Sequence, residues 1–105
     1  MWYIYMLLCR DGSLYSGITT DPARRFREHC AGTEGGGAKY TKTHKPVKIA
    51  ALWQAESRSA ASKLEAYLKK LPRSEKLLLT QGRDLPALPE KYTRLPEGEG
   101  EDNCR

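Results

Sequence analysis

Apolar, aromatic and β-branched residues gather in three short runs that the pattern predicts as strands. Residues 2–9 form an aromatic and aliphatic run that is followed by an Asp-Gly turn dipeptide at residues 11–12. Residues 14–18 then suit the returning strand of a hairpin, in which Gly17 marks a bulge or a close approach to the backbone. Residues 47–53 supply a third strand. The pattern therefore predicts a small antiparallel sheet of three strands.

Three further stretches have the spacing and the end signals of helices. The first has Asp21 as a candidate N-cap, Pro22 at its first position and Gly32 at its exit. Residues 59–71 place apolar side chains three and four positions apart, and a shorter helix is expected over residues 74–81. The order of strands and helices predicts an α+β fold in which a three-stranded antiparallel sheet is flanked by helices.

A single domain is expected over residues 1–82, because 105 residues suffice for one modest core. From residue 83 onward, prolines and acidic residues replace the periodic apolar pattern. Residues 83–105 are therefore expected to form an extended or disordered tail, which can be deleted from residue 85 without loss of stability.

The apolar run near the start is short and is interrupted by Arg10, so neither a membrane-spanning helix nor a secretory signal is expected. The cysteines, at positions 9, 30 and 104, are odd in number and have no CxxC spacing. This usage favours a reducing cytoplasm over an oxidising compartment.

The net charge of +5 is concentrated in the expected domain. Residues 1–82 hold 14 Lys and Arg against 7 Asp and Glu, whereas residues 83–105 hold 4 against 6. A basic surface on a small domain favours a nucleic-acid partner, although ribosomal and membrane-surface partners give the same pattern. Residues 35–46 form a stretch rich in glycine and lysine that suits phosphate binding. The candidate phosphate contacts are Arg24, Arg27, Lys39, Lys42, Lys45 and Lys69.

Five polar residues are candidates for chemistry, namely Tyr5, Tyr15, Arg25, His29 and Glu65. Each also has an ordinary structural interpretation. Strand tyrosines are commonly core or rim residues, and a helix Glu commonly pairs with a Lys four residues later, here Lys69. Trp2 and Trp53 are interpreted as core aromatics and not as surfaces for stacking bases.

The order of these residues along the chain is more specific than any one of them. Tyr3-Ile4-Tyr5 is followed ten residues later by Tyr15-Ser16-Gly17, then by Asp21, Arg25 and His29, a Gly-Gly-Ala-Lys-Tyr-Thr-Lys-Thr-His-Lys-Pro stretch, and Glu65. This order resembles the GIY-YIG nuclease superfamily over roughly the first three quarters of the chain. It is most similar to the small stand-alone bacterial members and to junction-cleaving catalytic domains. Tyr3 and Ser16 depart from the family pattern, which has glycine and an aliphatic residue there.

The resemblance implies a divalent-metal-dependent endonuclease that hydrolyses phosphodiester bonds in DNA, with a role in DNA repair or recombination. Glu65 matches the glutamate that binds Mg²⁺ or Mn²⁺, and Tyr5 matches the tyrosine proposed as general base. Tyr15 and Arg25 match residues that organise the scissile phosphate, and His29 matches an auxiliary histidine. The alternative is a non-catalytic nucleic-acid-binding module on the same scaffold.

Overall fold

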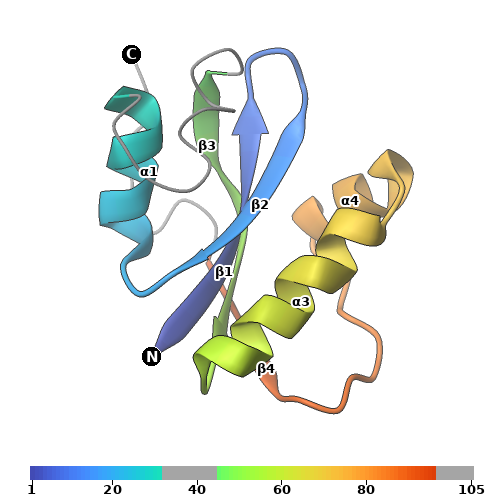
Figure 1. Cartoon of the computed structure of the whole chain (residues 1–105). Helices are drawn as coiled ribbons and strands as arrows, with labels where there is room; N and C mark the ends of the chain where they lie inside the picture. The colour runs from blue at the N-terminus through green and yellow to red at the C-terminus, as the bar shows by residue number, and fades with distance from the viewer. Residues whose placement is uncertain (32–44, 97–105) are drawn as a thin grey trace.

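The computed structural model describes residues 1–31 and 45–96, which form three layers with a sheet in the middle (Figure 1). The elements are β1 (Trp2–Cys9), β2 (Leu14–Thr19), α1 (Pro22–Ala31), β3 (Pro46–Ala55), α3 (Arg58–Lys70), α4 (Arg73–Thr80) and β4 (Tyr92–Leu95). The strands are antiparallel in the order β2-β1-β3-β4. Helix α1 covers one face of this sheet, and α3 and α4 cover the other. The predicted α+β class is confirmed.

Strands β1 and β2 form the predicted hairpin, with Tyr5 opposite Gly17 in the register. The turn needs a glycine because Gly12 adopts a φ of +84°, a conformation that L side chains rarely take. The backbone N–H of Gly12 donates to the carbonyl of Cys9 at 2.9 Å, and the carboxylate of Asp11 accepts from the backbone N–H of Ser13 at 3.0 Å. Local turn chemistry thus fixes which side chains of the two strands share a face.

Helix α1 begins as its sequence predicts. The Asp21 carboxylate accepts from the backbone N–H of Arg24 at 3.1 Å, which caps the helix, and Pro22 occupies the first turn. Phe26 is 1% exposed and packs in a cluster with Leu7, Ile49 and Leu52 of the sheet. Burial of the Phe26 ring sets the rotation of α1 about its axis. Arg25 and His29, one position before and three after Phe26, therefore lie on the side of the helix that faces the edge strand β2.

The opposite face of the sheet carries the larger core. Ile4, Met6 and Trp53 pack there against Leu64 and Leu68 of α3, and all five side chains are at most 2% exposed. The helix begins behind Ser57, whose hydroxyl accepts from the backbone N–H of Ala60 at 3.1 Å. Among residues 1–31 and 45–96, no helix is long and apolar enough to cross a membrane.

The sheet has one strand more than predicted. Strand β4 lies in the stretch expected to be an extended or disordered tail, and it pairs with the outer side of β3, with Tyr92 opposite Ala55 and Leu95 opposite Leu52. The Tyr92 hydroxyl also donates to the carbonyl of Ala60 at 2.6 Å. A strand of four residues next to proline carries too few alternating positions for its periodicity to be visible in the sequence.

Deleting residues 85–105 is therefore expected to lower the melting temperature by roughly 10 °C or more. The deletion removes β4 together with Leu85, Leu88 and Tyr92, which pack against the core, and a loss of about 2 kcal/mol shifts the midpoint of a domain this small by roughly that amount. A chain that ends at residue 96 keeps these contacts and is the control. Equal melting temperatures for the two truncated chains, measured by circular dichroism, would contradict a stabilising role for β4.

Candidate active site

Four of the five predicted chemical residues line one pocket at the β2 edge of the sheet. The pocket has a volume of about 330 Å³, and its lining residues are Trp2, Tyr5, Tyr15, Gly17, Ile18, Arg25, Arg58 and Glu65. Because β2 is the edge strand, Arg25 from α1 on one face and Glu65 from α3 on the other reach the same space. The fold thus brings together residues that lie far apart in the sequence.

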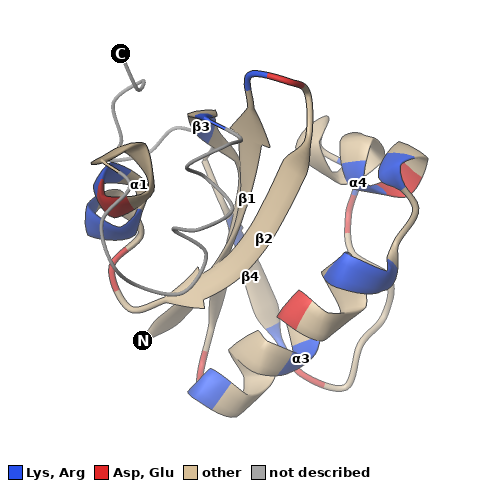
Figure 2. Cartoon of the chain, turned by 45° about the horizontal axis from the view of Figure 1, so that its top comes forward, with Lys and Arg blue, Asp and Glu red and all other residues tan. Residues whose placement is uncertain are grey.

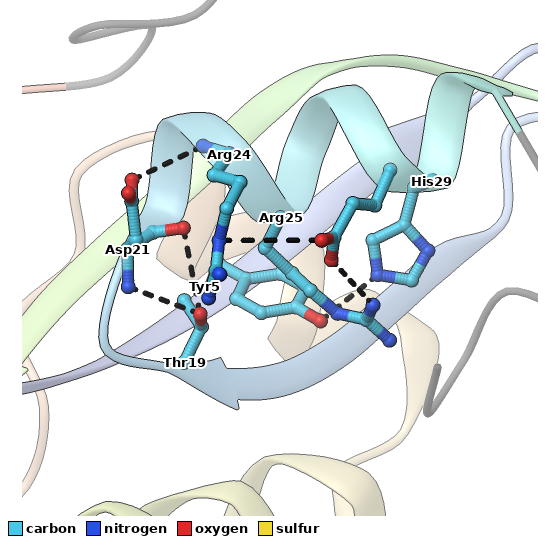
Figure 3. Close-up of polar contacts among 7 residues, drawn as sticks. Tyr5, Thr19, Asp21, Arg24, Arg25 and His29 are labelled. Carbon is cyan, nitrogen blue, oxygen red and sulfur yellow. Dashed lines mark hydrogen bonds and ion pairs between the residues drawn. The ribbon is translucent and has the colours of Figure 1, made fainter. Parts of the chain in front are cut away.

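His29, the fifth residue, lies behind the pocket and contacts its tyrosines. It is fully buried at 0% exposure, and its Nε2 lies 2.9 Å from the Tyr5 hydroxyl (Figure 3). Its ring also meets the rings of Tyr5 and Tyr15 edge-on, with centroids 5.7 and 5.5 Å apart. The structure therefore places this histidine in the interior, in contact with both tyrosines.

Burial shifts the pKa values of Tyr5 and His29 in opposite directions. It raises the pKa of the Tyr5 phenol to about 12, against the opposing influence of the Arg25 guanidinium. It lowers the pKa of His29 to about 4, and the positive charge of Arg25 adds to that effect. At neutral pH the phenol is therefore protonated and the imidazole is neutral. A neutral imidazole with its proton on Nδ1 accepts the Tyr5 hydrogen at Nε2.

Arg25 is held in place by an acid that sequence reasoning missed. Its side chain is only 11% exposed, and Nη1 donates to Oε1 of Glu28 at 2.9 Å. Glu28 also lies 4.0 Å from Nε of Arg24. The bond to Glu28 uses one of the five N–H donors of the guanidinium. The three-residue spacing of Arg25 and Glu28 on a helix was the available sequence signal for this pair.

Gly17 provides the space through which Tyr5 reaches the pocket. A Cβ atom at Gly17 would lie 2.3 Å from the Tyr5 hydroxyl oxygen and 2.6 Å from its Cζ, far inside van der Waals contact. The phenol therefore crosses the edge strand directly over the glycine backbone. The predicted close approach at Gly17 is confirmed, and the approaching group is Tyr5.

Glu65 projects from α3, and its side chain is 24% exposed. Its Oε2 lies 3.4 Å from Nζ of Lys69, so the ion pair expected from the four-residue spacing is present. The carboxylate also lines the pocket, where it is the one acidic group among the lining residues that the structure describes. No three His, Cys, Asp or Glu side chains cluster in a way that could hold a metal ion within the described ranges. One carboxylate with water ligands is a donor set that fits Mg²⁺ or Mn²⁺.

Of the predicted basic contacts, none that the structure describes is among the residues that line the pocket. Arg24 and Arg27 are exposed on α1, Lys45 is exposed before β3, and Lys69 pairs with Glu65. Lys39 and Lys42 lie outside the described residues. In Figure 2 the ribbons of both α1 and α3 carry blue segments that mark Lys and Arg positions.

Replacing His29 with Gln is expected to flatten the pH dependence of stability. Between pH 4 and 6.5 the unfolded chain protonates this histidine while the folded chain keeps it neutral, so stability falls as the pH falls through this range. The slope from one such group approaches about 1.4 kcal/mol per pH unit. Urea unfolding across this range measures it, with His44→Gln as the control. The same slope in the His29 variant and the parent chain would contradict the lowered pKa.

Comparisons with known proteins point to one family. A family model described as the GIY-YIG catalytic domain matches residues 1–77. A UPF0213 protein of Xanthomonas axonopodis pv. citri is 46% identical over 82 residues, covering 78% of each chain. A UPF0213 protein of Enterococcus faecalis is 51% identical over 76 residues, covering 70% of this chain and 83% of that protein. The solution NMR structure of a UPF0213 protein from Bacillus halodurans has 40% sequence identity and a TM-score of 0.48, and it covers 77% of this chain and 84% of that chain. The chain belongs to the GIY-YIG family.

Proposed function

We propose that this protein is a divalent-metal-dependent endonuclease that hydrolyses phosphodiester bonds in DNA. The observation that carries the proposal is the convergence of Tyr5, Arg25 and Glu65 on one pocket, with His29 bonded to Tyr5 from behind. The match of residues 1–77 to the GIY-YIG catalytic domain supports a nuclease reaction. A role in DNA repair or recombination follows from the resemblance to junction-cleaving members and is part of the same proposal.

Arg25 is the group that we assign to the scissile phosphate. Hydrolysis of a phosphodiester builds negative charge on the oxygens around phosphorus, and a fixed cation in a partly buried site stabilises that charge. The Arg25 side chain is nearly enclosed and is anchored by Glu28, so its orientation is set before the substrate arrives. The Tyr15 phenol lines the same pocket and is the second candidate donor to the phosphate.

The bond between Tyr5 and His29 supports a proton relay. With a pKa near 12, Tyr5 is not a phenolate at neutral pH, so it serves as a base only if it passes its own proton onward. The attacking water would give a proton to the Tyr5 oxygen while the Tyr5 hydrogen moves to Nε2 of His29. The water oxygen then bonds to phosphorus, and the bond from phosphorus to the leaving oxygen breaks, so that the leaving oxygen keeps the bonding electron pair and takes a proton from solvent. The negative phosphate offsets the cost of the imidazolium that forms.

Glu65 is the residue that we propose holds Mg²⁺ or Mn²⁺. A bound divalent ion supplies positive charge to the phosphate and to the leaving oxygen. Glu65 suits this role because its carboxylate lines the pocket, and the side chain of its partner Lys69 is more than half exposed. Nothing else in the proposed chemistry requires an acid at this position.

The proposed function is tested by cleavage of single-stranded, duplex and branched DNA oligonucleotides in Mg²⁺, Mn²⁺ or EDTA. Cleavage of at least one substrate with either ion, and none in EDTA, is the expected result. Tight binding without cleavage of any substrate would instead support a non-catalytic binding module. The two outcomes are read from the same samples by gel electrophoresis and fluorescence anisotropy.

A further inference from the structure

The pocket has a second wall that the proposed hydrolysis does not use. This wall consists of Trp2 at the start of β1, Ile18 on β2 and Arg58 at the start of α3. The guanidinium carbon of Arg58 lies 5.5 Å from the centroid of the Trp2 ring, which places the cation over the aromatic face. Apolar, aromatic and planar cationic groups therefore stand beside the residues assigned to the phosphate.

The two tryptophans of the chain differ in what they contact. Trp53 is 2% exposed and belongs to the core, as its sequence context predicts. Trp2 only packs against the edge of that core, is partly exposed, and lines the pocket. The interpretation of Trp2 as a purely core aromatic is thus incomplete. A tryptophan that presents ring surface to a site for polar chemistry is available for a flat ligand.

Arg58 adds little net stability at its position in the fold. Arg58 is the first residue of α3, where the helix dipole disfavours a cation, and this cost opposes the gain from its contact with the Trp2 ring. The first turn of α3 contains no acidic residue, and Arg58 forms no ion pair within the part of the chain that the structure describes. Arg58 is exposed, so its guanidinium is available to a ligand beside the Trp2 ring.

We propose that the nucleobase next to the scissile phosphate docks against Trp2 and Arg58. This inference rests on the proposed nuclease function and extends it to the substrate. Bases stack on aromatic rings and on guanidinium planes, and the pocket volume of about 330 Å³ falls within the range of sites for small ligands. Because a paired base is covered by its neighbours in the duplex stack, only an unpaired or flipped nucleotide presents its face to this wall. The substrate is therefore DNA with an unpaired nucleotide at the cleavage position.

The test compares two short oligonucleotides that have the same number of phosphates. One is a thymidine oligomer and the other is its abasic counterpart, in which tetrahydrofuran replaces every nucleoside. Binding is measured by fluorescence anisotropy in EDTA, so that cleavage plays no part. The parent chain is expected to bind the base-containing oligomer roughly 5- to 100-fold more tightly, the range that base stacking on an aromatic side chain gives.

Variants then test whether Trp2 and Arg58 cause the preference for the base-containing oligomer. Trp2→Leu and Arg58→Lys are expected to reduce the base-over-abasic ratio several-fold, whereas Trp2→Phe, which keeps an aromatic face, retains most of it. The matched control is Arg94→Lys, because Arg94 lies over the ring of Trp53 at 5.1 Å in the same kind of pair but outside this pocket. Arg94→Lys should leave the ratio unchanged. Because Arg58 is exposed, Arg58→Lys is expected to fold normally, and it keeps the positive charge while removing the planar guanidinium. It therefore measures the contribution of stacking even if Trp2→Leu folds poorly.

The failure of this inference is distinguishable from failure of the nuclease proposal. Affinity for both oligomers should fall steeply as salt rises, because both carry the same phosphates. Equal affinities with a steep salt dependence would overturn the nucleobase wall and leave the nuclease proposal intact. A ratio that survives Trp2→Leu and Arg58→Lys would also overturn it. Weak binding of both oligomers with no salt dependence would contradict the DNA-binding function itself.

Discussion

Glu65→Gln is expected to fold normally, to bind DNA at least as tightly as the parent chain, and to lose Mg²⁺-dependent cleavage by roughly 10²-fold or more. The amide keeps the shape and much of the helix propensity of the carboxylate but removes the charge that a hard divalent cation requires. Loss of a negative charge beside the pocket also reduces repulsion of the phosphate. Melting temperature, DNA affinity and cleavage measured on the same preparation separate these effects.

The ion pair with Lys69 defines the competing outcome. A pair between helix positions four residues apart contributes at most about 0.5 kcal/mol, so a Glu65 that only pairs with Lys69 would give a variant with full cleavage and a slightly lower melting temperature. Glu75→Gln is the matched control, because Glu75 on α4 pairs with Arg83 at 2.9 Å and does not line the pocket. Full activity in Glu65→Gln would remove Glu65 from the proposed site.

The parts of the fold that the sequence predicts correctly are those determined by neighbouring residues. The Asp-Gly turn at residues 11–12 and the Asp21-Pro22 start of α1 act through backbone conformation and short-range hydrogen bonds, which a linear pattern records. The bounds of the first three strands and of all three described helices differ from the predicted ones by at most two residues, because each has a continuous apolar run or stripe. Strand β4 has neither a continuous apolar run nor an apolar stripe. It forms through its pairing with β3, which is distant in the sequence.

The candidate site was predictable as a set of residues but not as an arrangement. The resemblance to the GIY-YIG family pointed to Tyr5, Arg25 and Glu65, and the structure places all three around one pocket. The burial of His29, and the contact of Arg58 with Trp2, depend on how α1 and α3 pack on opposite faces beside an edge strand. Such packing joins residues without a fixed sequence separation, so no pattern along the chain reports it.

Gly17→Ala is expected to lower both stability and cleavage, because it removes the space over which Tyr5 crosses β2. The new methyl group would lie 2.3 Å from the Tyr5 hydroxyl oxygen, so the phenol must move and its 2.9 Å contact with His29 must lengthen or break. Overpacking of this kind costs about 1–3 kcal/mol. If Tyr5 passes the proton of the attacking water to His29, cleavage should fall by roughly 10²-fold or more.

Tyr5→Phe separates the two consequences of Gly17→Ala, because it removes the hydroxyl while leaving the ring in the crowded position, where Cζ would lie 2.6 Å from the added methyl group. In the Tyr5→Phe background, Gly17→Ala should still lower the melting temperature, since the steric conflict with the ring remains. It should add little further loss of cleavage, since the group whose position matters is already absent. Denaturant unfolding and single-turnover cleavage of the parent chain, the two single variants and the double variant complete the cycle. If the two substitutions instead reduce cleavage independently, so that their losses multiply, Gly17 acts on some group other than the Tyr5 hydroxyl. The effect of Gly17→Ala would then be no evidence for a proton relay through His29.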